Sequence, residues 1–217
     1  MIINVSERPA ARWVALSRNS APLSMLASFI VALALVVAVF AFVRTADRYG
    51  IALRVTARWS FLLFWLAYTG DAMARIFGPR FTGLAHRRRH LGLAYGSAQV
   101  VHVALIVRLS YIVTEPFGAM LFFWAGIVCT YLLALFSVPQ LRDALGRRIW
   151  RASLTVATEY IALVFATDFI LLPLQAKGIG QYPLSYLPFA FMLVGGALMR
   201  VVATAQDRLS AKPKGER

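Results

Sequence analysis

Residues 21–43 read APLSMLASFIVALALVVAVFAFV, a run in which no side chain carries a formal charge. A helix needs about 20 mainly apolar residues to cross the hydrocarbon core of a bilayer. The run is too long for the apolar part of a cleavable signal peptide, and it lacks a clear small-x-small cleavage pattern. We therefore expect it to stay in the protein as a membrane anchor.

The rest of the chain has the same character. Its 217 residues are 60% hydrophobic and 15% charged, with a mean hydropathy of +0.68, whereas a soluble domain is about 45–50% apolar and about 25% charged. Further segments of spanning length occupy residues 57–76, 91–113, 117–138, 150–172 and 182–203. The predicted fold class is all-α, a polytopic membrane protein with a six-transmembrane-helix bundle. Segment 57–76 is the weakest, because Asp71 and Arg75 enter its last turns; without it, five helices would put the termini on opposite sides.

The formal net charge of +14 sits in short clusters between apolar runs. That placement argues against nucleic-acid binding, which favours one basic face with interleaved aromatic residues. With both termini in the cytoplasm, the external basic residues are only Arg44, Arg48, Arg54, Arg58, Arg108 and Lys177. The positive-inside rule thus predicts a cytoplasmic N-terminal segment (1–20), a transmembrane domain (21–204) and a basic, disordered cytoplasmic tail (205–217).

His102 is the one histidine inside an apolar segment, since His86 and His90 flank an arginine run. Tyr95 and Gln99 precede it by seven and three residues and are expected beside it on a helix. Gly92 and Gly96 would let a helix or a flat cofactor approach closely. Two interpretations stay open, an axial haem ligand and a histidine hydrogen-bonded across helices.

Charged residues inside the apolar segments are costly in lipid and therefore need partners or a role. Glu159 and Asp168 are nine residues apart, on opposite helix faces, so they predict no paired-carboxylate site. Glu159 is expected to find an arginine or a polar neighbour, and Asp71 to pair locally with Arg75. Arg108 is expected to extend outward or to contact a haem propionate or a lipid phosphate.

Several catalytic classes lack their motifs. The chain has no Ser-His-Asp order, no phosphate-cradling glycine loop and no dinucleotide fingerprint. Its one cysteine, Cys129, cannot form an internal disulfide and is expected to be a small buried hydrophobe. Hydrolase and nucleotide-enzyme functions are therefore unsupported, and a transporter is disfavoured by the lack of an inverted repeat.

A family resemblance rests on three motifs in order. ARWSFLLFWLA at 57–67, RRHLGLA at 88–94 and then His102 resemble the ferric reductase-like transmembrane domain family, which includes the membrane haem subunit of bacterial methionine-sulfoxide reductase systems. GRRIWR at 146–151 resembles the basic start of that family's fifth helix. The resemblance covers roughly residues 57–172.

The resemblance implies six helices in a bacterial inner membrane, a b-type haem between helices, and electron transfer. The electron donor would be a separate reductase or a quinol, with other membrane subunits as further partners. Of the residues of this chain, only His102 carries over from the family, as the ligand of the haem iron. The family's fifth helix also supplies histidines, but residues 150–172 contain none; Thr155, Tyr160 and Phe169 stand near those positions. A bis-histidine haem therefore cannot form within this chain.

Two predictions remain for function. One is a membrane electron-transfer subunit with at most one b-type haem through His102. The other is a haem-free relative that acts as a partner-binding or scaffold subunit, with a lipid or quinone in the old haem cleft. No complete catalytic site, flavin site or nicotinamide site is present, so the chain would be at most the electron-transfer subunit of an oxidoreductase.

Overall fold

The computed structural model describes residues 8–111, 117–137, 139–177 and 183–210. In this part of the chain every regular element is a helix, which confirms the all-α prediction. The elements are α1 (Arg8–Phe42), α2 (Arg48–Phe77), η1 (Pro79–Phe81), α3 (Thr82–Ser110), α4 (Phe117–Leu135), α5 (Pro139–Leu145), α6 (Arg147–Ala166), the π-helix η2 (Thr167–Leu171), α7 (Leu172–Lys177) and α8 (Leu187–Ser210).

Five helical stretches of the described chain are long and apolar enough to cross a membrane: Ala21–Phe42, Arg48–Phe77, Pro79–Ser110, Arg147–Gln175 and Leu187–Ser210. The apolar part of α4, Leu121–Leu135, is shorter. All 19 residues of α4 give about 28 Å of helix, close to the roughly 30 Å thickness of a bilayer core. The described residues thus form a helical membrane-type protein with five candidate spans and one shorter apolar helix.

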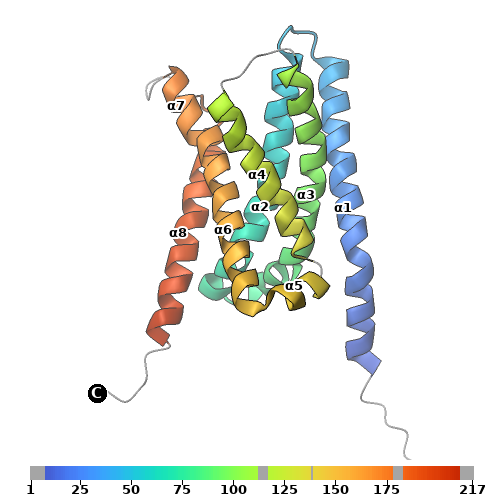
Figure 1. The fold of residues 1–217 in the computed structure, drawn as a ribbon, viewed down its shortest axis with the longest axis vertical. Coiled ribbons are helices and arrows are strands. Elements are labelled where there is room, and N and C mark those ends of the chain that lie inside the picture. The colour runs from blue at the N-terminus through green and yellow to red at the C-terminus, as the bar shows by residue number, and fades with distance from the viewer. Residues whose placement is uncertain (1–7, 112–116, 138, 178–182, 211–217) are drawn as a thin grey trace, which may run out of the picture.

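The long helices run side by side along one direction (Figure 1). α2 packs against α3 and α8, α1 packs against α3 and α2, and α4 packs against α6 and α3. α1 begins and α8 ends at the same end of the bundle, which we call the lower end, as drawn in Figure 1.

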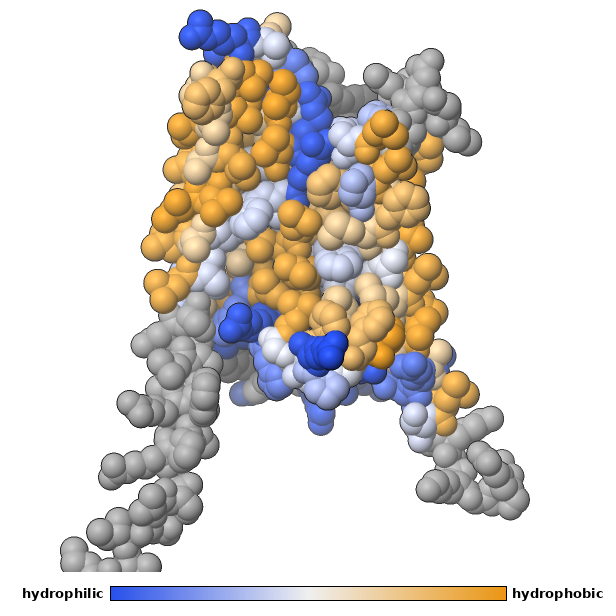
Figure 2. Space-filling view, turned by 180° about the vertical axis from the view of Figure 1, so that it is seen from behind, coloured by the Kyte–Doolittle hydropathy of each residue, from blue (hydrophilic) through white to orange (hydrophobic). Residues whose placement is uncertain are grey.

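Apolar and polar residues are distributed over the surface as in a membrane protein. Figure 2 shows hydrophobic residues over the middle of one face and hydrophilic residues gathered toward both ends. Large apolar side chains are openly exposed, such as Val37 (59%), Phe191 (73%) and Val201 (65%). An exposed apolar surface of this kind would promote aggregation in water but suits contact with lipid.

Two glycines allow close helix packing. A Cβ on Gly196 would lie 2.9 Å from both Thr69 Cγ2 and Trp65 Nε1, so α8 approaches α2 at this point. A Cβ on Gly126 would lie 2.9 Å from Val164 Cγ2, where α4 meets α6. Small residues at helix contacts gain packing that lipid cannot replace.

Several helices extend beyond their predicted bounds, since α1 and α3 begin at Arg8 and Thr82, and for two others the contacts show why. α2 begins at Arg48, well before residue 57, because the arginines of its first turns have partners there. The Arg54 guanidinium pairs with Asp47 at 2.6 Å, and the Arg48 guanidinium lies over the rings of Phe40 and Tyr49. α8 continues to Ser210, into the segment predicted as a disordered tail, and an ion pair between Arg75 and Asp207 ties its last turns to α2. Residues 211–217 lie outside the described residues.

Candidate functional site

His102 lies on α3 at the contact with α2. Its Nδ1 is 2.9 Å from the hydroxyl oxygen of Thr56, a residue with no exposed surface. The Thr56 hydroxyl also lies 2.9 Å from the carbonyl oxygen of Ala52 and 3.1 Å from that of Leu53. A hydrogen bond across helices, one of the two open interpretations, is therefore present.

The partners of Thr56 decide the His102 tautomer. The carbonyl oxygens of Ala52 and Leu53 can only accept, so the single hydroxyl proton of Thr56 goes to them. We therefore assign the proton of His102 to Nδ1, which donates to Thr56 Oγ1, and leave Nε2 with a free lone pair. A histidine held in this way can accept a hydrogen bond or bind iron through Nε2.

The residues predicted beside His102 point elsewhere. The Tyr95 hydroxyl is 2.9 Å from Thr130 Oγ1 of α4, and Gln99 Nε2 donates to the Tyr95 oxygen at 3.3 Å. A Cβ on Gly96 would lie 3.9 Å from the Cβ of Ala134 of α4, an ordinary contact distance, and a Cβ on Gly92 would meet nothing within 4 Å. Among the described residues, neither glycine is required by the close approach of a helix.

Arg108 is exposed in the last turn of α3. This agrees with the outward orientation expected for it. Its contact with a haem propionate stays a prediction, as does iron ligation by His102. Within the described residues no three His, Cys, Asp or Glu side chains gather to hold a metal ion.

The positions expected for a second haem ligand on the fifth spanning helix are occupied by other contacts. The Thr155 hydroxyl donates to the carbonyl oxygen of Arg151 at 3.0 Å, and the Tyr160 hydroxyl donates to that of Phe122 at 3.1 Å. Phe169 is a buried ring. None of the three turns a free ligand atom toward the bundle interior.

Aromatic rings fill the interior between α2, α3, α6 and α8. Neighbouring ring centroids lie 5.1 to 6.2 Å apart. This aromatic cluster consists of Phe61, Phe64, Tyr68, Tyr95, Phe165, Phe169, Tyr186 and Phe189. Rings at these separations are in contact, so a flat macrocycle could enter among them only by displacing side chains. The arrangement does not fit a b haem held between two ligands of this chain.

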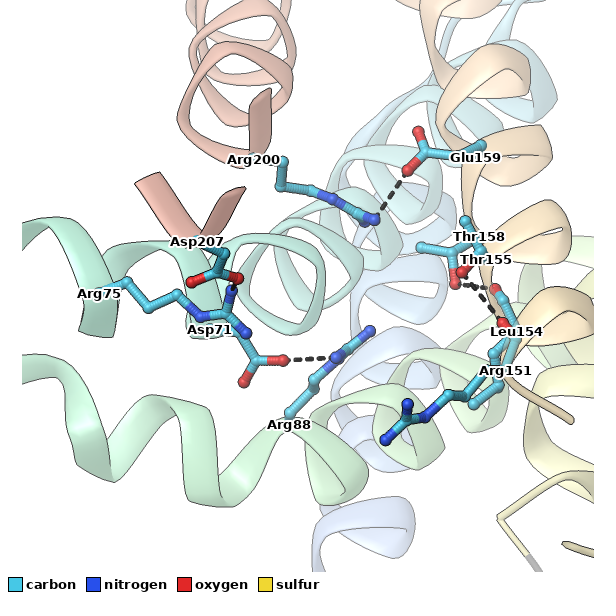
Figure 3. Close-up of polar contacts among 10 residues, drawn as sticks. All are labelled: Asp71, Arg75, Arg88, Arg151, Leu154, Thr155, Thr158, Glu159, Arg200 and Asp207. Atoms are coloured by element: carbon cyan, nitrogen blue, oxygen red, sulfur yellow. Dashed lines mark hydrogen bonds and ion pairs between the residues drawn. The ribbon is translucent and has the colours of Figure 1, made fainter. Parts of the chain in front are cut away.

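A second polar site lies deeper in the bundle than the helix ends. Glu159 of α6 pairs with Arg200 of α8 at 2.8 Å and accepts a hydrogen bond from the Tyr68 hydroxyl of α2 at 3.0 Å. The Arg200 guanidinium also lies over the Tyr68 ring, 4.1 Å from its centroid. Figure 3 shows Glu159 and Arg200 pointing toward each other. The expected arginine partner of Glu159 is thereby identified, and the charge of each group is compensated within apolar helices.

The predicted local pair of Asp71 and Arg75 is wrong. Asp71 instead pairs with Arg88 of α3 at 2.5 Å, and Arg75 pairs with Asp207 of α8 (Figure 3). Both side chains lean away from their own helix, since α3 and α8 flank α2 and offer opposite charges. These ion pairs therefore tie α2 to α3 and α2 to α8 near the lower end, and the pair of Glu159 with Arg200 ties α6 to α8 further into the bundle.

Asp168 lies in the π-helix η2, between α6 and α7. Its residue is partly buried. Single π turns inside α-helices recur at functional sites. No ion pair joins Asp168 to a basic side chain among the described residues.

Sequence reasoning missed two features of these sites. Thr56 was not considered as the partner of His102, because it lies before the predicted start of its helix. Arg200 was assigned only to the cytoplasmic side, although it sits over Tyr68 well above the end of α8. Its position inside an apolar stretch was the signal that it needs a buried partner.

Comparison of the chain with family models, curated proteins and solved structures finds no match in any of the three.

Proposed function

We propose that this chain is a haem-free membrane subunit of the ferric reductase-like type that acts by binding a partner rather than by carrying electrons. The observation that supports it is the aromatic cluster. Phe61 has no exposed surface and touches Phe165, Phe169 and Phe189 at centroid distances of 5.2, 5.1 and 5.8 Å. The rings of the chain itself fill this part of the interior, and this supports a subunit without haem among them.

We extend the proposal to topology. The helix order and the shared end of α1 and α8 (Figure 1) favour six crossings, with α4 as the sixth, over five. The arginines at the lower end favour a cytoplasmic position for that end. A bacterial inner membrane is the location that the family resemblance suggests.

A second candidate is an electron-transfer subunit with one b-type haem on His102, fed by a quinol or a separate reductase. One observation favours it. Thr56 fixes the His102 ring through Nδ1, which is how proteins orient a metal-binding histidine and direct Nε2 to iron. The second axial ligand would then come from another subunit or be absent.

A His102→Ala variant separates the two candidates when both proteins are purified from haem-replete cells. The binding-subunit proposal expects the visible spectrum of wild type and variant to be the same, and the variant to lose only the stability that the Thr56 bond provides. Loss of a Soret band in the variant, with unchanged helical content, would contradict the proposal and support electron transfer.

A further inference from the structure

The lower end of the bundle holds more arginines than its facing carboxylates can neutralise. Asp71, Glu159 and Asp207 turn toward the space between α2, α3, α6 and α8, and each is already paired with an arginine. In Figure 3, Arg151 of α6 points into this space toward Arg88 of α3. It is exposed and has no ion-pair partner among the described residues.

Helical geometry keeps Arg151 away from the nearest acid on its own helix. Glu159 lies two turns further along α6 and is held by Arg200 and Tyr68. Thr155, one turn from Arg151, directs its hydroxyl proton to the backbone. The guanidinium donors of Arg151 therefore stay available on the side that faces Arg88. Arg88 pairs with Asp71 through one nitrogen, and its other guanidinium nitrogens stay available too.

Two guanidinium groups that point toward one another repel unless an anion lies between them. An Arg fork matches the oxygens of a phosphate or carboxylate, and two forks can hold one phosphate from both sides. Arg87, Arg89, Arg147 and Arg148 stand nearby on the same two helices and add to the positive potential. The site thus has the charge and the donors for a monoanionic phosphate.

We infer that Arg88 and Arg151 bind the phosphate of an anionic phospholipid at the lower end of the bundle, between α3 and α6. The inference is independent of the proposed function, because neither residue belongs to the aromatic cluster or to the His102 site. An inorganic phosphate offers the same oxygens without the acyl chains, so the test includes it.

The surroundings favour a lipid over an acidic protein. Arg151 follows Trp150, whose Nε1 donates to the carbonyl oxygen of Phe136 at 3.1 Å, and tryptophan marks the membrane interface. On the same helix Ile149 and Val156 are 59% and 68% exposed, so α6 offers apolar surface to lipid acyl chains at the level of the arginines. A phosphate at the level where the apolar band ends is what a phospholipid supplies.

The test counts lipids bound to the full chain in detergent micelles by native mass spectrometry. The probes are phosphatidylglycerol, phosphatidylcholine and inorganic phosphate. Arg151→Gln removes the unpaired arginine, and its side chain makes no contact on which folding depends. Arg208→Gln is the matched control, an equal loss of charge at an exposed position near the end of α8.

We expect wild type to bind phosphatidylglycerol in preference to phosphatidylcholine. Arg151→Gln should weaken the binding of the first phosphatidylglycerol molecule by about fivefold, because one arginine near an anionic lipid contributes about 1 kcal/mol. Arg208→Gln should weaken the same binding by less than about twofold. Equal weakening by both variants, or no preference for phosphatidylglycerol, would overturn the inference and leave an acidic protein as the partner of this end. If only inorganic phosphate binds in an Arg151-dependent way, the lipid assignment is overturned.

Discussion

Replacement of Phe61 by alanine is the sharpest test of the packed interior. Phe61 is fully buried on α2 and makes three edge-to-face contacts, with Phe165, Phe169 and Phe189. The variant removes all three contacts at once and leaves a cavity where α2, α6 and α8 meet. If these rings hold the helices together, the loss should appear as a large fall in stability.

The magnitude follows from the contacts. Phe→Ala in the core of a soluble protein costs about 3–5 kcal/mol, partly from transfer out of water and partly from the cavity. In a bilayer the transfer part shrinks, because lipid is as apolar as the core. Each aromatic pair contributes about 0.5–1.5 kcal/mol beyond area, so three pairs give an expected loss of about 1.5–4.5 kcal/mol, with a central value of about 3 kcal/mol.

The assay is thermal unfolding of the purified protein in one detergent. A loss of this size should lower Tm by about 5–10 °C for a chain of this length. Phe191→Ala is the matched control, since Phe191 is 73% exposed on α8 and should cost less than about 0.5 kcal/mol. Equal Tm values for the two variants would refute the reasoning and point to an interior loose enough for a cofactor.

Three further variants test separate contacts by the same unfolding assay. Thr56→Val removes the hydroxyl that His102 contacts and should cost about 1 kcal/mol, and an unchanged Tm would mean that the bond contributes nothing. Glu159→Gln leaves the half-buried Arg200 without its carboxylate. The free energy of unfolding should fall by about 1–2 kcal/mol, a loss between those expected for an exposed and for a buried ion pair. The control Asp207→Asn breaks an exposed pair and should lower it by less than about 1 kcal/mol. Gly196→Val places a side chain against Thr69 and Trp65 and should cost about 1–3 kcal/mol through overpacking. Gly195→Val is its control because a Cβ there meets nothing within 4 Å, and equal losses would argue against the close contact of α2 and α8.

The helical membrane architecture follows from local sequence. Runs such as residues 21–43 are uncharged and long enough to span, so composition alone predicts them. The start of α2 was harder to predict, because Arg48 and Arg54 look like loop residues until their partners are known. Those partners, Phe40, Tyr49 and Asp47, become visible only when the chain folds back.

The sites depended more on tertiary contacts. Spacing along one helix suggested that Asp71 pairs with Arg75, but both residues found partners on neighbouring helices, since interhelix geometry overrides an i,i+4 pair of modest strength. The cost of placing a charge among apolar helices correctly predicted that Glu159 needs a partner. That argument did not identify the partner as Arg200. The aromatic cluster draws rings from α2, α3, α6, η2 and the start of α8, and no periodicity in one segment could reveal that they meet.

The haem content of the wild-type protein decides whether the packed interior excludes a haem. A pyridine haemochrome assay gives haem per chain, and a reduced-minus-oxidised spectrum shows whether any haem is of the b type. For a protein purified from haem-replete cells with its helical content intact, the account predicts no stoichiometric haem, because side chains of the chain fill its interior. Close to one b haem per chain would contradict the account and identify His102 as the first candidate for its ligand.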